Sequence, residues 1–197
     1  MNFKLILITT PAMQEGETKQ IIALFEKGLQ TLHVRKPNSS LGAMRSFLAS
    51  IPKKFHRRLV IHGHYRLTNE FNLKGIHLTE KTRRKKLPAS FNKKKHTLSA
   101  SFHSIAEVLG SKRKYDYLFL SPIYNSISKK GYKSHFKEQE LRQLLIGKRN
   151  IIALGGVAPG TISDLKQMGF AGAASLGHVW ESKDPVKSYK ELASKIK

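Results

Sequence analysis

Histidines stand at the ends of several short apolar runs of this chain, where a side chain can transfer a proton or bind a ligand. His62 follows the run at 59–61, and Ser101 and His103 follow the run at 97–100. An imidazole with its ordinary pKa of about 6.5 accepts and returns a proton at neutral pH. We therefore predict His103 as the first acid–base residue and His62 as the second. Six of the nine histidines occupy such positions: His33, His62, His64, His77, His103 and His178.

Glycines end two consecutive apolar runs near the C-terminus, which is a pattern that suits the binding of an anion. Gly155 and Gly156 follow the run at 151–154, and Gly177 follows the run at 171–176. Glycine allows positive φ angles and lets a ligand approach backbone N–H groups, and the helix that follows directs the positive end of its dipole to the same place. We predict a phosphate site here, formed by Gly155, Gly156, Gly177 and His178.

Further cations and hydroxyl groups follow other apolar runs. Arg35 follows the run that begins at Thr31, and Ser126, Ser128 and Lys129 come after the run at 117–120. Charged and hydroxyl side chains of this kind hydrogen-bond to phosphate oxygens. We therefore predict a phosphorylated small molecule as the substrate.

Carboxylates are rare at these positions, and this bears on metal binding. Glu80, which lies beyond His77, is the one acidic residue near the end of an apolar run, whereas magnesium prefers oxygen ligands that are usually carboxylates. The chain has no cysteine, so a thiolate site is excluded. His62, His64 and His77 form an alternative zinc set, because residues two apart on a strand share a face. No other feature marks a metal site, and we expect none.

The elements that would carry these residues are short strands alternating with helical segments. Eight strands in such an alternation predict a parallel sheet closed as a single-domain (β/α)8 barrel over residues 1–197, with its functional residues at the C-terminal ends of the strands. An open doubly wound sheet is the alternative, but no G-x-G-x-x-G turn follows the first strand. The helix after the fourth strand is expected to be short or absent. The predicted strands are 5–8, 31–35, 59–61, 75–78, 97–100, 117–120, 151–154 and 171–176.

Composition narrows the class of protein. The 197 residues are 40% hydrophobic, as in a globular protein, and no apolar run approaches the roughly 20 residues that cross a membrane, so we expect a cytoplasmic protein with no membrane partner. The net charge is +23, with basic runs at 81–86 and 93–95. No aromatic platform accompanies the first run, so we interpret the charge as solvated surface and expect no nucleic acid partner. A homodimer is compatible with the sequence.

Six motifs, in order along nearly the whole chain, resemble those of the thiamine phosphate synthase/TenI family. The resemblance implies a (β/α)8 barrel and, for the synthases, the joining of a pyrimidine pyrophosphate to a thiazole phosphate with magnesium on the pyrophosphate. The motifs are LHVRK at 32–36, GIHL at 75–78, LSASFHS at 98–104, YDYLFLSPIY at 115–124, SKKG at 128–131 and ALGGV at 153–157.

The resemblance also implies roles for particular residues. Arg35 corresponds to the arginine that binds pyrophosphate, and Ser101 to the serine that contacts it. Lys129 corresponds to the lysine that neutralises the leaving group, which makes it a third catalytic candidate. Gly156, Gly177 and His178 match the site for the thiazole phosphate.

Departures from the synthase pattern put its reaction in question. The two carboxylates that hold magnesium are replaced by Gly63 and Thr82, so we expect no magnesium cofactor. His33 and His62 replace a glutamine and an asparagine. The TenI branch, which isomerises a thiazole carboxylate phosphate, also lacks these carboxylates, although its histidine after the sixth strand corresponds to Pro122 here. We predict a TenI-like isomerase; the alternatives are a synthase with atypical metal ligation and a non-catalytic ligand-binding or regulatory protein.

Overall fold

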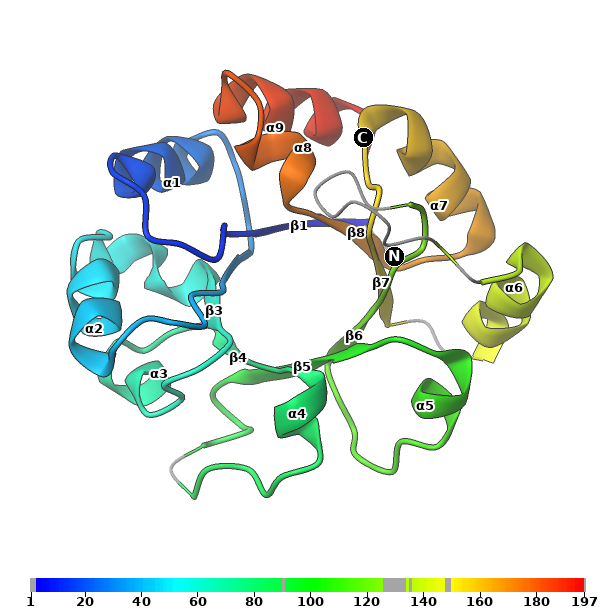
Figure 1. Cartoon of the computed structure of the whole chain (residues 1–197), viewed down its shortest axis with the longest axis horizontal. Coiled ribbons are helices and arrows are strands. Elements are labelled where there is room, and N and C mark those ends of the chain that lie inside the picture. Colours follow the sequence, from blue (N-terminus) through cyan, green and yellow to red (C-terminus); the bar gives the residue numbers. More distant parts are fainter. Residues whose placement is uncertain (1–2, 90, 126–133, 135, 148–149, 197) are drawn as a thin grey trace.

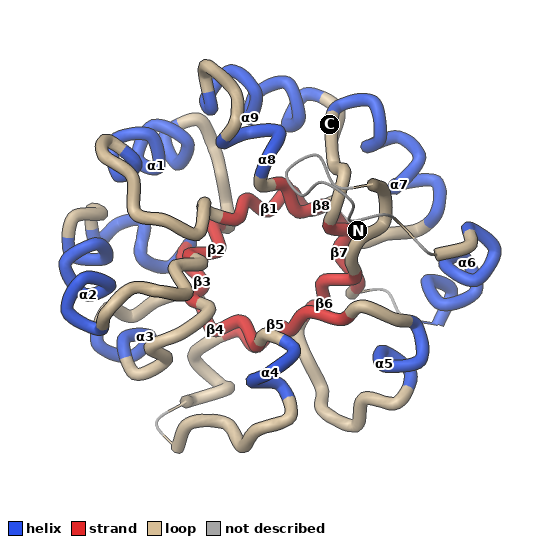
Figure 2. The backbone as a smooth tube through the Cα atoms, viewed as in Figure 1, coloured by secondary structure: helices blue, strands red, loops and turns tan. Residues whose placement is uncertain are grey.

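A computed structural model describes residues 3–89, 91–125, 134, 136–147 and 150–196. Its strands pair in parallel, each with the next along the chain, and β8 pairs with β1, so the sheet is a closed barrel (Figures 1 and 2). The predicted (β/α)8 fold is confirmed. The strands are β1 (Lys4–Ile8), β2 (Leu32–Val34), β3 (Leu59–Ile61), β4 (Gly75–Leu78), β5 (Thr97–Phe102), β6 (Tyr117–Leu120), β7 (Ile151–Leu154) and β8 (Gly172–Ser175).

Helices form a ring outside the strands (Figure 2). The basic segment after β4 keeps only a four-residue helix, as expected. The short helix α8 and the 3-10 turn η1 were not predicted, because one or two turns are too short to show a helical period. The helices are α1 (Glu17–Glu26), α2 (Leu41–Ala49), α3 (Leu67–Glu70), α4 (Glu80–Arg83), α5 (Ile105–Leu109), α6 (Glu138–Gly147), α7 (Ile162–Met168), α8 (Gly177–Trp180) and α9 (Pro185–Ser194), with 3-10 turns η1 (Lys53–Arg58) and η2 (Pro159–Thr161).

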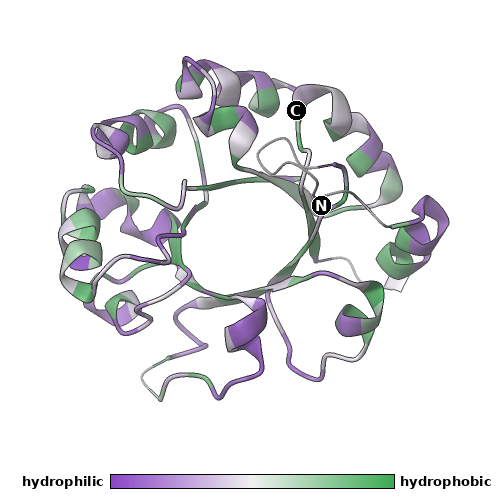
Figure 3. Ribbon diagram, in the orientation of Figure 1, coloured by the Kyte–Doolittle hydropathy of each residue, from purple (hydrophilic) through white to green (hydrophobic). Residues whose placement is uncertain are grey.

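The strands are mostly hydrophobic, and hydrophilic residues gather on the outer helices and loops (Figure 3). Alternate residues of a strand point to opposite faces, so each strand contributes to two cores. The larger core lies between the barrel and the helices and includes Leu7, Leu32 and Ile151. The smaller core fills the barrel itself with Ile6, Ile8, Tyr117, Phe119, Ile152 and Ala174.

Helix α5 begins at a side-chain cap. The Oγ of Ser104 accepts a hydrogen bond from the backbone N–H of Glu107 at 3.2 Å, so Ser104 is the N-cap. The Glu107 carboxylate accepts from the backbone N–H of His103 at 3.2 Å. These two bonds fix the chain direction directly after β5, and hence the position of His103. In the described part of the chain, no helix has the length and apolar character needed to cross a membrane.

Candidate functional site

The interior of the barrel has a polar side and an apolar side. Polar side chains come from β2 to β6: those of His33, His77, Ser99 and Tyr117 are buried in the barrel. The ring of Phe119 borders this polar side, with its centroid 4.7 Å from those of both His33 and His77. The opposite side is formed by aliphatic residues of β1, β7 and β8, which are Ile6, Ile8, Ile152 and Ala174.

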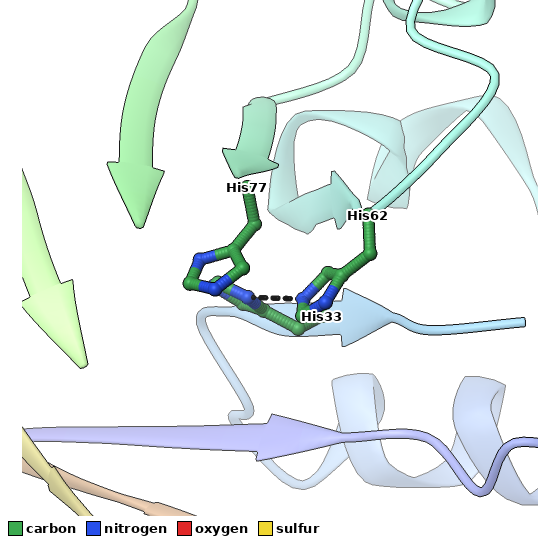
Figure 4. A group of neighbouring side chains, drawn as sticks. All are labelled: His33, His62 and His77. Carbon is green, nitrogen blue, oxygen red and sulfur yellow. Dashed lines mark hydrogen bonds between the residues drawn. The ribbon is translucent and has the colours of Figure 1, made fainter. Parts of the chain in front are cut away.

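Three imidazoles from neighbouring strands lie together on the polar side (Figure 4). His33 is on β2, His62 directly follows β3, and His77 is on β4. One nitrogen from each ring lies within 4.8 Å of the other two. Nδ1 of His33 lies 2.9 Å from Nε2 of His62, and the rings of His62 and His77 stack with centroids 4.2 Å apart. We call His33, His62 and His77 the histidine cluster.

Hydroxyl groups contact two members of the histidine cluster, His33 and His77. Nε2 of His33 lies 2.6 Å from the hydroxyl of Tyr117. Nδ1 and Nε2 of His77 lie 2.9 Å and 2.7 Å from the Oγ atoms of Ser99 and Ser101. A hydroxyl both donates and accepts, so it satisfies either tautomer of a neutral imidazole.

Burial keeps all three imidazoles neutral. It lowers the pKa of His77 from 6.5 to about 3. Burial is also the main cause that lowers the pKa of His33 and of His62 well below the ordinary value, and the neighbouring imidazoles add to it. The Arg35 guanidinium lowers the pKa of His62 further. At neutral pH the cluster therefore has lone pairs to offer and no charge.

The structure corrects the histidine set considered for zinc. His64 lies outside the cluster, because its backbone has φ of 50° and its Nε2 lies 2.9 Å from the carbonyl oxygen of Ser39. His33 takes its place. The assumption that His62 and His64 continue one strand was wrong, since β3 ends at Ile61.

Ser101 and His103 face different partners at the end of β5. Ser101 is on the strand, and its hydroxyl contacts His77. His103 lies after the strand, with Nδ1 3.1 Å from the carbonyl oxygen and 3.3 Å from the Oγ of Ser121. The strand β5 ends at Phe102, between the two residues. Their functional roles stay predictions.

The glycines predicted to bind phosphate lie close to one another at the ends of adjacent strands. β7 pairs with β8, and Gly155 and Gly156 follow β7 with φ of 97° and 64°. Gly177 opens α8, directly after β8. Nε2 of His178 is buried and has no hydrogen-bond partner among the described residues. The backbone geometry of this turn fits an anion site, which remains a prediction.

Two basic residues follow β2 and differ in their surroundings. Arg35 is partly buried and close enough to act on His62, as its effect on that pKa indicates. The ammonium of Lys36 is fully buried and bonds both carboxylate oxygens of Glu17, at 2.6 and 2.7 Å, and the carbonyl of Ala12 at 2.6 Å. Of these two residues, Lys36 is engaged by Glu17, and the ligand-binding role of Arg35 stays a prediction. Ser126, Ser128 and Lys129 lie outside the described residues.

The residues at the two expected magnesium positions do not fit that ion. Gly63 has no side chain, and the Thr82 hydroxyl lies 3.2 Å from that of Tyr65 and 3.1 Å from that of Thr79. Magnesium requires several hard oxygen ligands in octahedral geometry, and neither position supplies a carboxylate. These two positions therefore do not form a magnesium site.

Comparisons with known proteins agree on one family. The model of the family TMP-TENI, described as thiamine monophosphate synthase, matches residues 5–179. A thiamine phosphate pyrophosphorylase from Bacteroides thetaiotaomicron is 36% identical, with a TM-score of 0.85 over 98% of this chain and 97% of that one. One from Pyrococcus furiosus is 18% identical, with a TM-score of 0.79 over 98% and 95%, which is evidence for the fold alone. A search of curated proteins finds no match.

Proposed function

Because the chain belongs to the thiamine monophosphate synthase family, we propose that it binds a thiazole phosphate or a similar phosphorylated heterocycle and moves a proton on it, as a TenI-like isomerase. The observation that supports this reaction most is the composition of the barrel mouth. Gly63 and Thr82 stand where the resemblance places magnesium carboxylates, while the imidazoles of His62 and His103 follow β3 and β5 at the same end of the barrel. A proton transfer needs an acid–base group and no leaving-group cation.

The phosphate of the ligand would bind at the ends of β7 and β8. Backbone N–H groups at Gly156 and Gly177 can donate to its oxygens, and Nε2 of His178, which has no partner among the described residues, lies in the same segment. Arg35, which follows β2, supplies a positive charge for a second anionic group of the ligand.

His103 is the proton-transferring residue of this proposal. A proton on its Nδ1 is held by donation to the Ser121 carbonyl at 3.1 Å, and this tautomer places the lone pair on Nε2. Nε2 would accept a proton from a ring carbon of the ligand and return it at another atom. We do not assign this role to His62, because its Nε2 already bonds His33 and its pKa is lowered well below neutrality.

Synthase activity is the second candidate, and one observation favours it. The Bacteroides protein, 36% identical over 98% of this chain, is described as a thiamine phosphate pyrophosphorylase. With that reaction, the chain would couple a pyrimidine pyrophosphate to the thiazole phosphate.

Two assays on the same preparation separate these functions. For the isomerase, thiazole carboxylate phosphate is incubated in D2O, and deuterium uptake into its ring is followed by NMR. We expect exchange in the wild-type protein and in His64→Asn, a histidine substitution outside the proposed reaction. His103→Asn should retain ligand binding and lose the exchange. Equal exchange in His103→Asn and the wild type would show that His103 is not the base.

For the synthase, the thiazole phosphate and the pyrimidine pyrophosphate are combined with and without magnesium, and thiamine phosphate is measured. We expect little or no product. Strong magnesium-dependent product formation would establish the synthase instead, and ligand binding without either reaction would indicate a binding or regulatory protein.

A further inference from the structure

The histidine cluster is more than three imidazoles buried in a barrel, because hydroxyl groups hold two of its rings in place. His33 presents Nδ1 toward His62, while its Nε2 contacts the hydroxyl of Tyr117 at 2.6 Å. His77 contacts the hydroxyl of Ser99 through Nδ1 at 2.9 Å and that of Ser101 through Nε2 at 2.7 Å. In metal sites one nitrogen of a histidine ligates and the other is oriented by a hydrogen-bond partner, as Tyr117 can orient His33 and Ser99 can orient His77.

We propose that His33, His62 and His77 bind one divalent transition-metal ion of the zinc class. The ligating atoms in this proposal are Nδ1 of His33, Nε2 of His62 and Nε2 of His77, and Figure 4 shows the three rings side by side, with one nitrogen of each within 4.8 Å of the other two. Nε2 of His77 would exchange its contact with Ser101 for the ion. With the metal bound, His33 carries its proton on Nε2, where the oxygen of Tyr117 accepts it. This proposal differs from the sequence-based expectation of a protein without a metal. It does not depend on the proposed function.

The ligand chemistry decides the class of metal. A neutral imidazole is a ligand for zinc, cobalt, nickel and copper, and catalytic zinc sites with three histidines leave a fourth position for water. Magnesium and calcium prefer oxygen ligands, and the cluster has no carboxylate.

The cluster is reached from the end of the barrel where the predicted site residues lie. His33 and His77 are fully buried, whereas His62 is partly exposed, so His62 borders the route by which an ion enters. The hydroxyl of Ser101 lies 2.7 Å from Nε2 of His77, so it would adjoin an ion bound to that nitrogen. The fourth position therefore faces the end of β5, where a ligand oxygen can replace water.

Cobalt titration tests the proposal directly. Untagged protein is treated with a chelator, dialysed and titrated with Co²⁺, and visible absorption is recorded; Zn²⁺ is then added as a competitor. We expect bands typical of a four-coordinate site that saturate at one equivalent and disappear with zinc, with no effect of magnesium. His62→Asn should bind at least about 100-fold more weakly, since even loss of an outer partner costs roughly 10–100-fold.

Two further variants keep the test decisive. Tyr117→Phe removes only the outer partner of His33 and should weaken binding roughly 10–100-fold. His64→Asn is the matched control and should bind as the wild type does, because its ring lies outside the cluster and asparagine tolerates its positive φ. A wild-type protein without saturable bands, or His62→Asn and Tyr117→Phe with wild-type affinity, would overturn the proposal.

Discussion

Acid should destabilise this protein through its buried neutral histidines, and His77 allows the effect to be calculated. Its pKa is about 3 in the folded protein and 6.5 as a free side chain. Between these values the unfolded chain binds a proton that the folded chain does not, so stability is complete above pH 6.5 and is lost as the pH falls. At pH 5 the loss from this one group is about 2 kcal/mol relative to pH 8, with a slope that approaches 1.36 kcal/mol per pH unit.

Removing the imidazole should remove this pH dependence. The free energy of unfolding of the wild type minus that of His77→Asn should fall by about 2 kcal/mol from pH 8 to pH 5. His33 and His62 also have lowered pKa values and therefore also make the wild type less stable in acid. Because His77 is one cause of those lowered pKa values, the variant should lose part of their pH dependence as well. Taking the difference between the two proteins cancels the destabilisation by acid that the net charge of +23 causes in both.

Urea unfolding, followed by circular dichroism at several pH values between 8 and 5 with a chelator present, measures the difference. His64→Asn is the control for loss of a histidine outside the cluster. If the curves of wild type and His77→Asn against pH run parallel, His77 is not held neutral by burial and the reasoning is refuted.

Two other substitutions test the packing around the site. Glu17→Gln should destabilise the protein by about 3–5 kcal/mol, because it leaves the buried Lys36 ammonium without its counter-charge. The control is Glu70→Gln, which lies in an exposed ion pair and should change the free energy of unfolding in urea little. Equal destabilisation by the two substitutions would contradict the argument. Gly156→Ala should cost about 1–2 kcal/mol and weaken sulfate or phosphate binding in a thermal-shift titration, because φ is 64° and the added Cβ would lie 2.5 Å from a side-chain carbon. Gly160→Ala is the control, because open space surrounds that position. Unchanged anion binding in Gly156→Ala would exclude the predicted phosphate site.

The local pattern of the chain was enough to predict the barrel. Four strands, at 59–61, 75–78, 117–120 and 151–154, have the predicted bounds, because each is a short apolar run that ends in polar residues or glycine. Eight such runs alternating with helical segments have few ways to bury both faces of the sheet. The glycine-ended strands β7 and β8 are neighbours for the same reason.

Only the tertiary structure decided which histidines meet. His33 and His62 are 29 residues apart, and their contact depends on the pairing of β2 with β3 and on closure of the barrel, which no local pattern contains. The sequence grouped His64 with His62 by spacing alone, but a positive φ turns the chain away after β3. The same holds for Lys36, whose charge is neutralised by Glu17 from a preceding helix. Residue types therefore indicated which chemistry is available, and strand register decided which residues lie close enough to act together.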